Sequence, residues 1–463
     1  MKTFFTKSAL YLALTIPAFF FLGCDDSEEG GSYEFSVEPT VLTFSAKQET
    51  QTLSVRTYGD WSIVLPQDAA WLKVSAMSGR EPAEIEVTAE NYYRTDTSRT
   101  ARLTVTGGNS GDFHVEVVQR KLQMNDLSAA GKANCYIVPT SGDFVIDAAT
   151  QGNSESEQVG EWTSAELLWE DNRELITDLY GDPESKRIFF STAAAGNAVI
   201  AVKDASGKIL WSWHIWATDF DPNAKTLKYT NDNGSTWEFM DRNLGAANAE
   251  SGSFGAFGLL YQWGRKDPFT AATAFAPENP SETIRWNMLN NPLPAMASDA
   301  DSMGTVQLSI EHPTSFYVTR YAHGDWNGQP DPNLWGAVSG QKTVYDPCPA
   351  GWRVPAYDAQ GDSPYAFVTR QTTTGTDNIG RIYTDGNGND FLFPVAGSRV
   401  NGTGTLDCPG NYGSLWTATG KTTSNEDGTI EYGCLLFFTT GRLVSATYYD
   451  TRSQGVSVRC VKE

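Results

Sequence analysis

The sequence predicts a mostly β protein of about three domains, and three observations support this fold class. Glycine, threonine, serine and aromatic residues are plentiful, whereas long runs of alanine, leucine, glutamate and lysine are missing; this composition favours strands joined by turns. Apolar and polar residues alternate in short stretches over residues 34–120, which is the period of a half-buried strand. The length of 463 residues suits domains of roughly 150 residues each.

The charge balance narrows the classes of partner. The chain carries 34 basic and 56 acidic residues, a formal net charge of −22. Nucleic-acid binding requires basic patches that neutralise phosphates, and the few lysines and arginines form no such patch. We therefore exclude a nucleic-acid partner and interpret the acidity as a solvated surface.

Residues 1–23 have the features of a secretory signal. Lys2 and Lys7 precede an apolar run over residues 9–21, which is too short to span a bilayer. The following Leu22-Gly23-Cys24 resembles the bacterial lipobox, which implies lipidation of Cys24 and a lipid-anchored place at the outer membrane. An ordinary signal peptide is the alternative, although no A-x-A cleavage site stands nearby.

Residues 24–33 form an acidic tether. Asp25, Asp26, Glu28 and Glu29 precede two glycines, so we expect a solvated, flexible segment. The acidic run resembles the surface-export signal of Bacteroidetes lipoproteins, which implies exposure at the cell surface.

Residues 34–120 show short strands separated by turns, which predicts an immunoglobulin-like β-sandwich. The alternating apolar positions are Leu53/Val55, Trp61/Ile63, Ile85/Val87/Ala89, Ala101/Leu103/Val105 and Phe113/Val115/Val117. Because Trp61 and Trp71 fall in strand phase, we interpret them as core aromatics rather than sugar platforms.

Motifs in this first sandwich carry a family resemblance. They are Gly59-Asp60-Trp61, Ala70-Trp71-Leu72, Ser78-Gly79, Ala89-Glu90-Asn91, Thr97-Ser98-Arg99-Thr100-Ala101 and Val117-Val118-Gln119. Together they resemble the Bacteroidetes-associated carbohydrate-binding often N-terminal (BACON) domain. The family name implies glycan binding, and a role as a spacer is the alternative.

Residues 122–220 predict a second β-sandwich module. Asn134–Val138 has the pattern of a strand, and residues 197–202 and 208–216 flank the turn residues 204–207. The second arm is apolar on both faces, which is typical of a central strand. Its tryptophans 211, 213 and 216 therefore belong to the core or to a domain junction, with sugar stacking as the alternative. We interpret His214 as a hydrogen-bonded structural residue.

Residues 225–463 hold the most specific set of motifs. In order they are Trp237–Gly245, Leu259–Trp263, Asp346–Pro355, Tyr412–Thr417 and Val458–Val461. Together they resemble the Fibrobacter succinogenes major paralogous domain, which is similar to C-type-lectin-like and sulfatase-modifying-factor folds. The resemblance implies an α+β, C-type-lectin-like domain. A long insertion, roughly residues 265–343, departs from the family pattern.

Five cysteines remain when Cys24 is set aside, and four of them lie in the last domain. Export to an oxidising compartment permits disulfides, and four cysteines allow three connectivities. The family resemblance implies the pairs Cys348–Cys460 and Cys408–Cys434. We interpret Cys135 as a buried thiol in an apolar strand.

Catalytic and metal motifs are missing from the sequence. Its four histidines form no H-E-x-x-H, and no G-x-S-x-G or phosphate-binding loop occurs. Gln329-Pro330-Asp331 matches a calcium tripeptide of lectins, and Asp385–Asp390 resembles half a calcium loop, yet both lack the remaining ligand positions. We therefore predict no catalytic residue, no metal site and no cofactor, with calcium possible but unsupported. Enzymatic use of Cys434, implied by the sulfatase-modifying resemblance, is the alternative.

The remaining candidates for ligand binding are aromatic residues in turn-rich segments. An exposed ring presents a flat apolar face and a polar edge, which suits a sugar. The candidate residues are Trp326, Trp335, Tyr448, Tyr449 and Arg452. The alternative is that they pack the insertion onto the domain.

Together these features predict a non-enzymatic surface lipoprotein. Two β-sandwiches would form a stalk, and a terminal head would recognise a glycan or glycoprotein in adhesion or nutrient capture. A structural or accessory subunit of a surface fibre is the second hypothesis, and a sulfatase-modifying-factor-like enzyme is the third.

Overall fold

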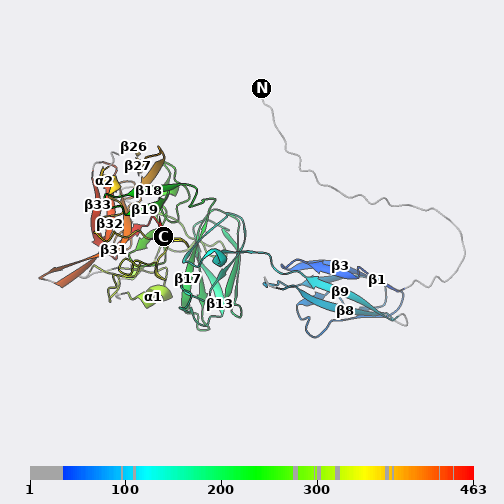
Figure 1. The fold of residues 1–463 in the computed structure, drawn as a ribbon. Helices are drawn as coiled ribbons and strands as arrows, with labels where there is room; N and C mark the ends of the chain where they lie inside the picture. The colour runs from blue at the N-terminus through cyan, green and yellow to red at the C-terminus, as the bar shows by residue number, and fades with distance from the viewer. Residues whose placement is uncertain are drawn as a thin grey trace, which may run out of the picture. The chain divides into compact units, whose positions relative to one another are not determined.

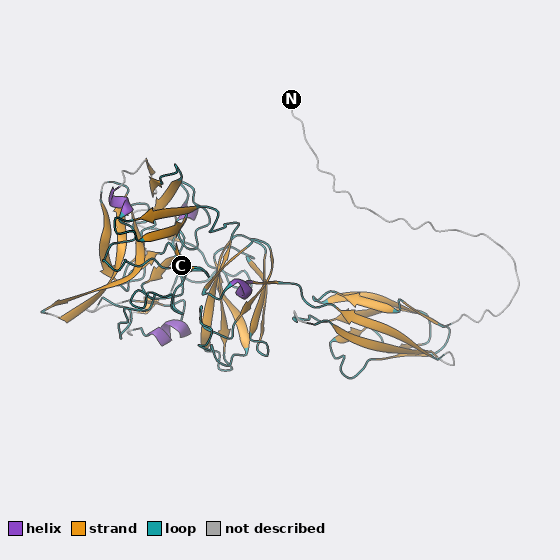
Figure 2. Ribbon diagram, viewed as in Figure 1, coloured by secondary structure: helices purple, strands orange, loops and turns teal. Residues whose placement is uncertain are grey.

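The computed structural model describes residues 35–94, 97–107, 111–274, 280–296, 298–299, 304–318, 324–370, 375–377, 380–426, 428–441 and 443–463. The chain forms two compact units, one ending at Leu122 and one beginning at Gln123 (Figure 1). Strands dominate both units, so the predicted mostly β class is confirmed (Figure 2). The signal, the tether and Cys24 lie outside the described residues. Within them, no helix is long and apolar enough to cross a membrane.

The first unit is a β-sandwich of two sheets. One sheet has the order β1-β3-β7-β5, and the other has the order β2-β9-β8-β4-β6. The strands are β1 (Ser36–Glu38), β2 (Val41–Phe44), β3 (Glu49–Arg56), β4 (Trp61–Val64), β5 (Leu72–Val74), β6 (Ser78–Gly79), β7 (Ala83–Ala89), β8 (Arg99–Gly107) and β9 (Asp112–Gln119).

The core of the first unit consists of the predicted alternating residues. Leu53 and Val55 from one sheet meet Leu103 and Val115 from the other, because every second residue of a strand points to the same face. Trp61 is buried in this core, as expected. Trp71 is half-buried and packs against the same core from its margin, and the guanidinium of Arg99 lies 4.2 Å from its ring centre.

The second unit begins with another β-sandwich. Its sheets have the orders β10-β12-β15-β14 and β11-β17-β16-β13. The strands are β10 (Asn125–Asp126), β11 (Cys135–Val138), β12 (Gly142–Asp147), β13 (Ser164–Glu170), β14 (Ile176–Asp182), β15 (Arg187–Thr192), β16 (Gly196–Lys203) and β17 (Ile209–Ala217). A short helix, η1 (Leu127–Ala130), follows β10.

Strand β17 joins this sandwich to the rest of the unit. Trp211 and Trp213 fill the sandwich core, whereas Trp216 belongs to the larger core formed with residues beyond 225. All three rings are buried, which places them in the core and the junction. Their apolar surfaces on both faces of one strand explain why the sandwich and the last domain pack together.

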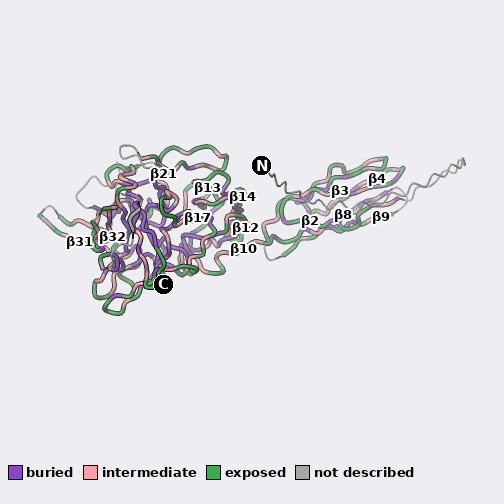
Figure 3. Tube along the Cα trace, turned by 90° about the horizontal axis from the view of Figure 1, so that it is seen from above, coloured by how far each residue is buried: buried purple, intermediate pink, exposed green. Residues whose placement is uncertain are grey.

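The last domain is built around a seven-stranded sheet. Its main path is β30-β29-β34-β31-β32-β33, with β20 paired to β34. These strands are β20 (Leu260–Gln262), β29 (Ser398–Arg399), β30 (Leu406–Asp407), β31 (Tyr412–Asn425), β32 (Gly428–Thr439), β33 (Val444–Thr451) and β34 (Gly455–Ser457). Buried residues gather inside the domain and exposed residues line its outside (Figure 3).

Smaller elements surround this sheet. A four-stranded sheet has the order β18-β19-β35-β25. The strands outside the large sheet are β18 (Thr226–Thr230), β19 (Thr236–Met240), β21 (Ala272–Ala274), β22 (Ser281–Glu282), β23 (Ser298–Asp299), β24 (Phe316–Tyr317), β25 (Trp352–Arg353), β26 (Gly375–Asp377), β27 (Gly380–Thr384), β28 (Asp390–Pro394) and β35 (Val461–Lys462). The helices of this domain are η2 (Phe254–Ala256), α1 (Val306–Glu311) and α2 (Phe367–Arg370). The C-type-lectin-like assignment stays a prediction.

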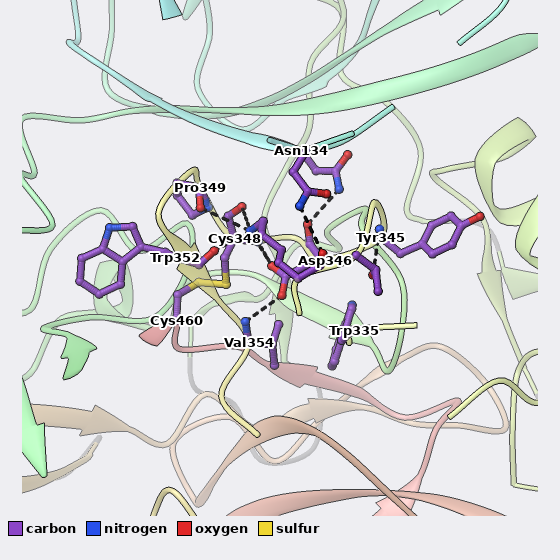
Figure 4. Close-up of polar contacts among 12 residues, drawn as sticks. Asn134, Trp335, Tyr345, Asp346, Cys348, Pro349, Trp352, Val354 and Cys460 are labelled. Atoms are coloured by element: carbon purple, nitrogen blue, oxygen red, sulfur yellow. Dashed lines mark hydrogen bonds and ion pairs between the residues drawn. A yellow bond between two sulfur atoms is a disulfide. The ribbon is translucent and has the colours of Figure 1, made fainter. Parts of the chain in front are cut away.

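The segment Asp346–Pro355 is a structural junction (Figure 4). The Asp346 carboxylate accepts hydrogen bonds from the backbone N–H groups of Cys348 at 2.8 Å and Val354 at 2.9 Å. Asn134, just before β11, donates from Nδ2 to the carbonyl oxygens of Val344 at 2.6 Å and Asp346 at 2.9 Å. The second sandwich is therefore part of one unit with the last domain, rather than a separate stalk module.

Candidate ligand-binding surface

The two tryptophans predicted to bind ligand are buried, which corrects that prediction. Trp326 is 2% exposed and Trp335 is fully buried. The indole of Trp326 donates to the carbonyl of Trp263 at 2.7 Å, and that of Trp335 donates to the carbonyl of Arg265 at 3.2 Å. Both rings therefore pack the insertion onto the domain and offer no face to a ligand.

Arg452 is also buried, so its predicted ligand contact is wrong. Its guanidinium forms ion pairs with Asp325 at 2.9 Å and Glu431 at 3.0 Å. The same group lies 4.3 Å from the ring centre of Trp263. A buried cation needs paired carboxylates to offset its lost hydration, so Arg452 serves the core.

Tyr448 and Tyr449 are exposed, as a ligand-binding role requires. Their exposed fractions are 45% and 39%. Both lie on β33, which ends the large sheet within the described part of the chain. Their ring centres are 6.3 Å apart and their planes differ by 26°. Consecutive strand residues normally face opposite sides, yet these two rings stack against each other at the edge of the sheet, where no further described strand pairs with β33.

More aromatic rings continue this surface on both sides. The ring of Phe437 lies 5.0 Å from Tyr448, and the ring of Tyr432 lies 4.9 Å from Tyr449. The ammonium group of Lys421 lies 3.8 Å from the centre of the Tyr449 ring, a cation–π contact. We call Tyr432, Phe437, Tyr448 and Tyr449 the aromatic edge. It combines flat apolar faces with phenol hydroxyls that donate and accept hydrogen bonds.

One of the two disulfides that the resemblance implies is present. Cys348 and Cys460 form a disulfide, whereas Cys408 and Cys434 are both free, so the second predicted pair is wrong. Cys408 lies in a turn just before Tyr412, which pairs with Thr439, while Cys434 lies five residues along β32 from Thr439. At about 3.3 Å per residue this is roughly 16 Å along the strand, far beyond the limit of about 7 Å for a disulfide.

The environment of Cys434 opposes the enzymatic alternative. Its side chain is buried on β32, and burial raises the pKa of the thiol, although Lys421 and Tyr357 partly oppose this shift. A reactive cysteine needs the opposite, a lowered pKa at an accessible site. Burial also raises the pKa of Cys135, which lies in β11 as the predicted buried thiol.

The two calcium-like segments use their carboxylates for turns. Asp331 accepts a hydrogen bond from the N–H of Asn333 at 2.8 Å. Asp385 accepts from the N–H groups of Asn387 and Asn389, each at 2.8 Å, in the hairpin between β27 and β28. Among the described residues, no group of three or more histidine, cysteine, aspartate or glutamate side chains could hold a metal ion.

The sequence did not predict the hollows in the described part of the chain, which include two open ones of about 660 and 680 Å³. A third, of about 470 Å³, lies in the first unit beside Tyr58, whose side chain is 70% exposed, and is also lined by Arg56 and Glu84. A smaller one, of about 240 Å³, lies beside Asp171 and Asn197 in the second unit. An exposed tyrosine next to the turn Gly59-Asp60 was a signal for the hollow beside Tyr58, whereas no local pattern marks the one beside Asp171.

The fold and these surfaces define a multidomain, mostly β protein with an exposed aromatic surface suited to ligand binding. Residues 61–120 match the BACON family, described as "Putative binding domain, N-terminal". This match confirms the BACON resemblance of the first unit. No curated protein matches this chain.

Solved structures resemble parts of the chain. A Bacteroides ovatus xyloglucanase in complex with a heptasaccharide is 24% identical, with a TM-score of 0.18, over 23% of this chain and 27% of that chain. A Bacteroides thetaiotaomicron protein is 20% identical, with a TM-score of 0.16, over 22% of this chain and 100% of that one. A protein from Porphyromonas gingivalis is 12% identical, with a TM-score of 0.17, over 40% and 99%. These TM-scores are too low to support an argument.

Proposed function

We propose that this chain is a non-enzymatic lipoprotein of the bacterial cell surface that binds a glycan or glycoprotein through the aromatic edge. The single observation that carries the proposal is the pair of exposed, nearly parallel rings of Tyr448 and Tyr449. The C–H face of a sugar packs against such a ring, and neighbouring hydroxyls bond to its polar edge. The BACON match of the first unit supports a carbohydrate ligand, as the family name implies.

The composition of the aromatic edge favours a carbohydrate over an apolar partner. Three of its four members are tyrosines, which keep a hydrogen-bonding hydroxyl at the end of an apolar ring. Two consecutive rings also allow one glycan chain to contact more than one platform.

The anchor and the fold of the last domain complete the proposal. The lipobox-like Leu22-Gly23-Cys24 and the acidic tether support lipid attachment and surface exposure. The ordered motifs from Trp237 to Val461 support a Fibrobacter succinogenes major paralogous domain with a C-type-lectin-like fold. The lipid would hold the N-terminus at the outer membrane and leave both compact units available to ligands.

A glycan array probed with residues 25–463 tests the proposal, with and without calcium. We expect specific binding that falls at least tenfold in a Tyr448→Ala/Tyr449→Ala double variant, because each lost ring contact is worth about 1 kcal/mol or more. Tyr180→Ala is the matched control, since Tyr180 is 38% exposed on β14. No binding above background, or equal binding by the double variant and the control, would contradict the proposal.

A subunit or accessory part of a surface fibre is the second candidate function. Strand β33 ends its sheet within the described residues, and such an edge can pair with a strand from another chain. Part of this edge is already occupied, because the Ala446 carbonyl accepts hydrogen bonds from Ser363 at 2.5 Å and Tyr357 at 3.4 Å. Recovery of the protein from cell envelopes in high-mass assemblies would favour this function over glycan binding.

A further inference from the structure

The cavity beside Asp171 lies where the second sandwich meets the last domain. Its volume is about 240 Å³. Asp171 follows β13 and Asn197 begins β16, so the sandwich provides one wall. The last domain provides the rest, through η2 and the residues before and after it, and through β21 with Ala271 and Thr283 beside it. The lining residues are Asp171, Asn197, Gly245, Ala247, Phe254, Gly255, Gly258, Leu259, Ala271, Ala272, Thr273 and Thr283.

A fixed carboxylate forms the polar wall of this cavity. Asp171 Oδ1 accepts a hydrogen bond from the backbone N–H of Asn197 at 2.6 Å, and Oδ2 accepts from Asn197 Nδ2 at 2.7 Å. Each carboxylate oxygen has two lone pairs, so each keeps the capacity for one more donor. Both oxygens accept from N–H donors, as those of an ionised carboxylate do, while burial raises the pKa of Asp171 to about 6.

Hydrogen bonds from both domains fix the orientation of Asn197. Its Nδ2 donates to Asp171 at 2.7 Å and to the carbonyl of Gly245 at 2.9 Å. Because both N–H bonds are used in this way, Oδ1 accepts, and the partner is His214 Nε2 at 2.9 Å. Nε2 therefore carries the ring proton. Burial lowers the pKa of His214 to about 3, so the ring is neutral and brings no competing charge near the cavity.

The opposite side of the cavity offers an aromatic ring and hydroxyls. Phe254 is half-buried and packs edge-on against Phe257, with ring centres 5.2 Å apart. The hydroxyl of Thr283 donates to the carbonyl of Ala271 at 3.0 Å, and its oxygen can still accept a hydrogen bond. The lining thus joins one carboxylate acceptor, hydroxyl groups and one aromatic ring.

This combination selects among ligand classes. An anion would be repelled by Asp171, and a divalent metal ion takes six or more oxygen ligands, whereas the lining has one carboxylate and no described group of three or more histidine, cysteine, aspartate or glutamate side chains could hold a metal ion. A purely apolar ligand would leave the carboxylate without hydration. We propose that this cavity is a binding site for one neutral sugar residue, whose hydroxyls donate to Asp171 and whose C–H face packs on Phe254. The site is separate from the aromatic edge and does not depend on it.

Saturation-transfer NMR with residues 25–463 tests the proposal. The probes are the methyl glycosides of glucose, galactose and mannose at millimolar concentration. We expect transfer to at least one probe, with a Kd raised at least tenfold in both Asp171→Asn and Phe254→Ala. Asp219→Asn is the matched control, because Asp219 is exposed outside this cavity.

Two further readouts keep the result unambiguous. Circular dichroism shows whether each variant is folded. If the Asp171→Asn variant does not fold, the Phe254→Ala variant alone carries the test. The Tyr448→Ala/Tyr449→Ala variant should keep its transfer signal, which separates this site from the proposed glycan surface. No transfer to any of the three probes, or equal Kd values in the wild type and both cavity variants, would overturn the proposal.

Discussion

Replacement of Asn134 by alanine should strongly destabilise the second unit. Asn134 is 2% exposed, and its side chain makes three hydrogen bonds. Two go to carbonyl oxygens of the last domain, and the third accepts from the indole of Trp211 at 3.1 Å. Each buried group left unpaired costs about 1–3 kcal/mol. Allowing for relaxation and water entry, we expect the free energy of unfolding to fall by about 3–6 kcal/mol.

Urea unfolding of residues 123–463 measures this loss, followed by far-ultraviolet circular dichroism and tryptophan fluorescence. Asn134→Asp should be no better than Asn134→Ala, because a carboxylate would face the carbonyls of Val344 and Asp346. Asn223→Ala, at an exposed position, should change stability by less than about 0.5 kcal/mol. A loss below about 1 kcal/mol in Asn134→Ala would refute the reasoning, since it would mean that the sandwich and the last domain do not depend on each other.

Three other predictions concern the disulfide, a buried histidine and the free thiols. Cys348→Ser should lower the unfolding free energy by about 4–5 kcal/mol, because the disulfide closes a loop between residues 112 apart; non-reducing mass analysis and urea titration check this, and an unchanged midpoint would contradict it. The pKa of His214 is lowered to about 3 in the folded protein, whereas that of a free histidine is about 6.5. Between about pH 3 and pH 6.5 the unfolded state therefore binds one more proton than the folded state, and the free energy of unfolding falls by about 1.4 kcal/mol for each unit that the pH falls. His214→Gln should remove this contribution to the pH dependence of the free energy of unfolding. The same pH dependence in the variant and the wild type would contradict the assignment to His214. In the folded protein a maleimide should label the part-exposed Cys408 and leave the buried Cys434 unmodified until urea is added. Equal labelling rates for the two thiols would contradict the burial of Cys434.

The sequence predicts strands well where local periodicity reflects burial on one face. Leu53/Val55 and Leu103/Val105 alternate with polar residues and form opposite walls of the first core. The turn over residues 204–207 likewise forms as its local chemistry indicates, because Asp204 accepts hydrogen bonds from the N–H groups of Ser206 and Lys208. These features depend on near neighbours in the chain.

The exposure of the candidate ligand residues depends on distant contacts and could not be predicted. Trp326 follows turn residues and Tyr449 follows another aromatic residue, so the local sequence does not distinguish a buried ring from an exposed one. In the structure, the Trp326 indole donates a hydrogen bond to the distant Trp263 carbonyl, whereas Tyr449 lies on a strand at the edge of a sheet. The cavity beside Asp171 brings together residues from 171 to 283, a span that no periodic pattern covers. The pairing of Cys408 with Cys434 was wrong for the same reason, because the spacing of cysteines in the sequence does not give their distance in a sheet.

Hydrogen–deuterium exchange of residues 25–463, with and without a glycan identified on the array, tests the central claim most directly. We predict that the glycan slows exchange in β33 and in the facing residues 430–438 of β32, and that the Tyr448→Ala/Tyr449→Ala variant loses this protection. Protection confined to other parts of the chain, or unchanged protection in the double variant, would contradict glycan recognition at the aromatic edge.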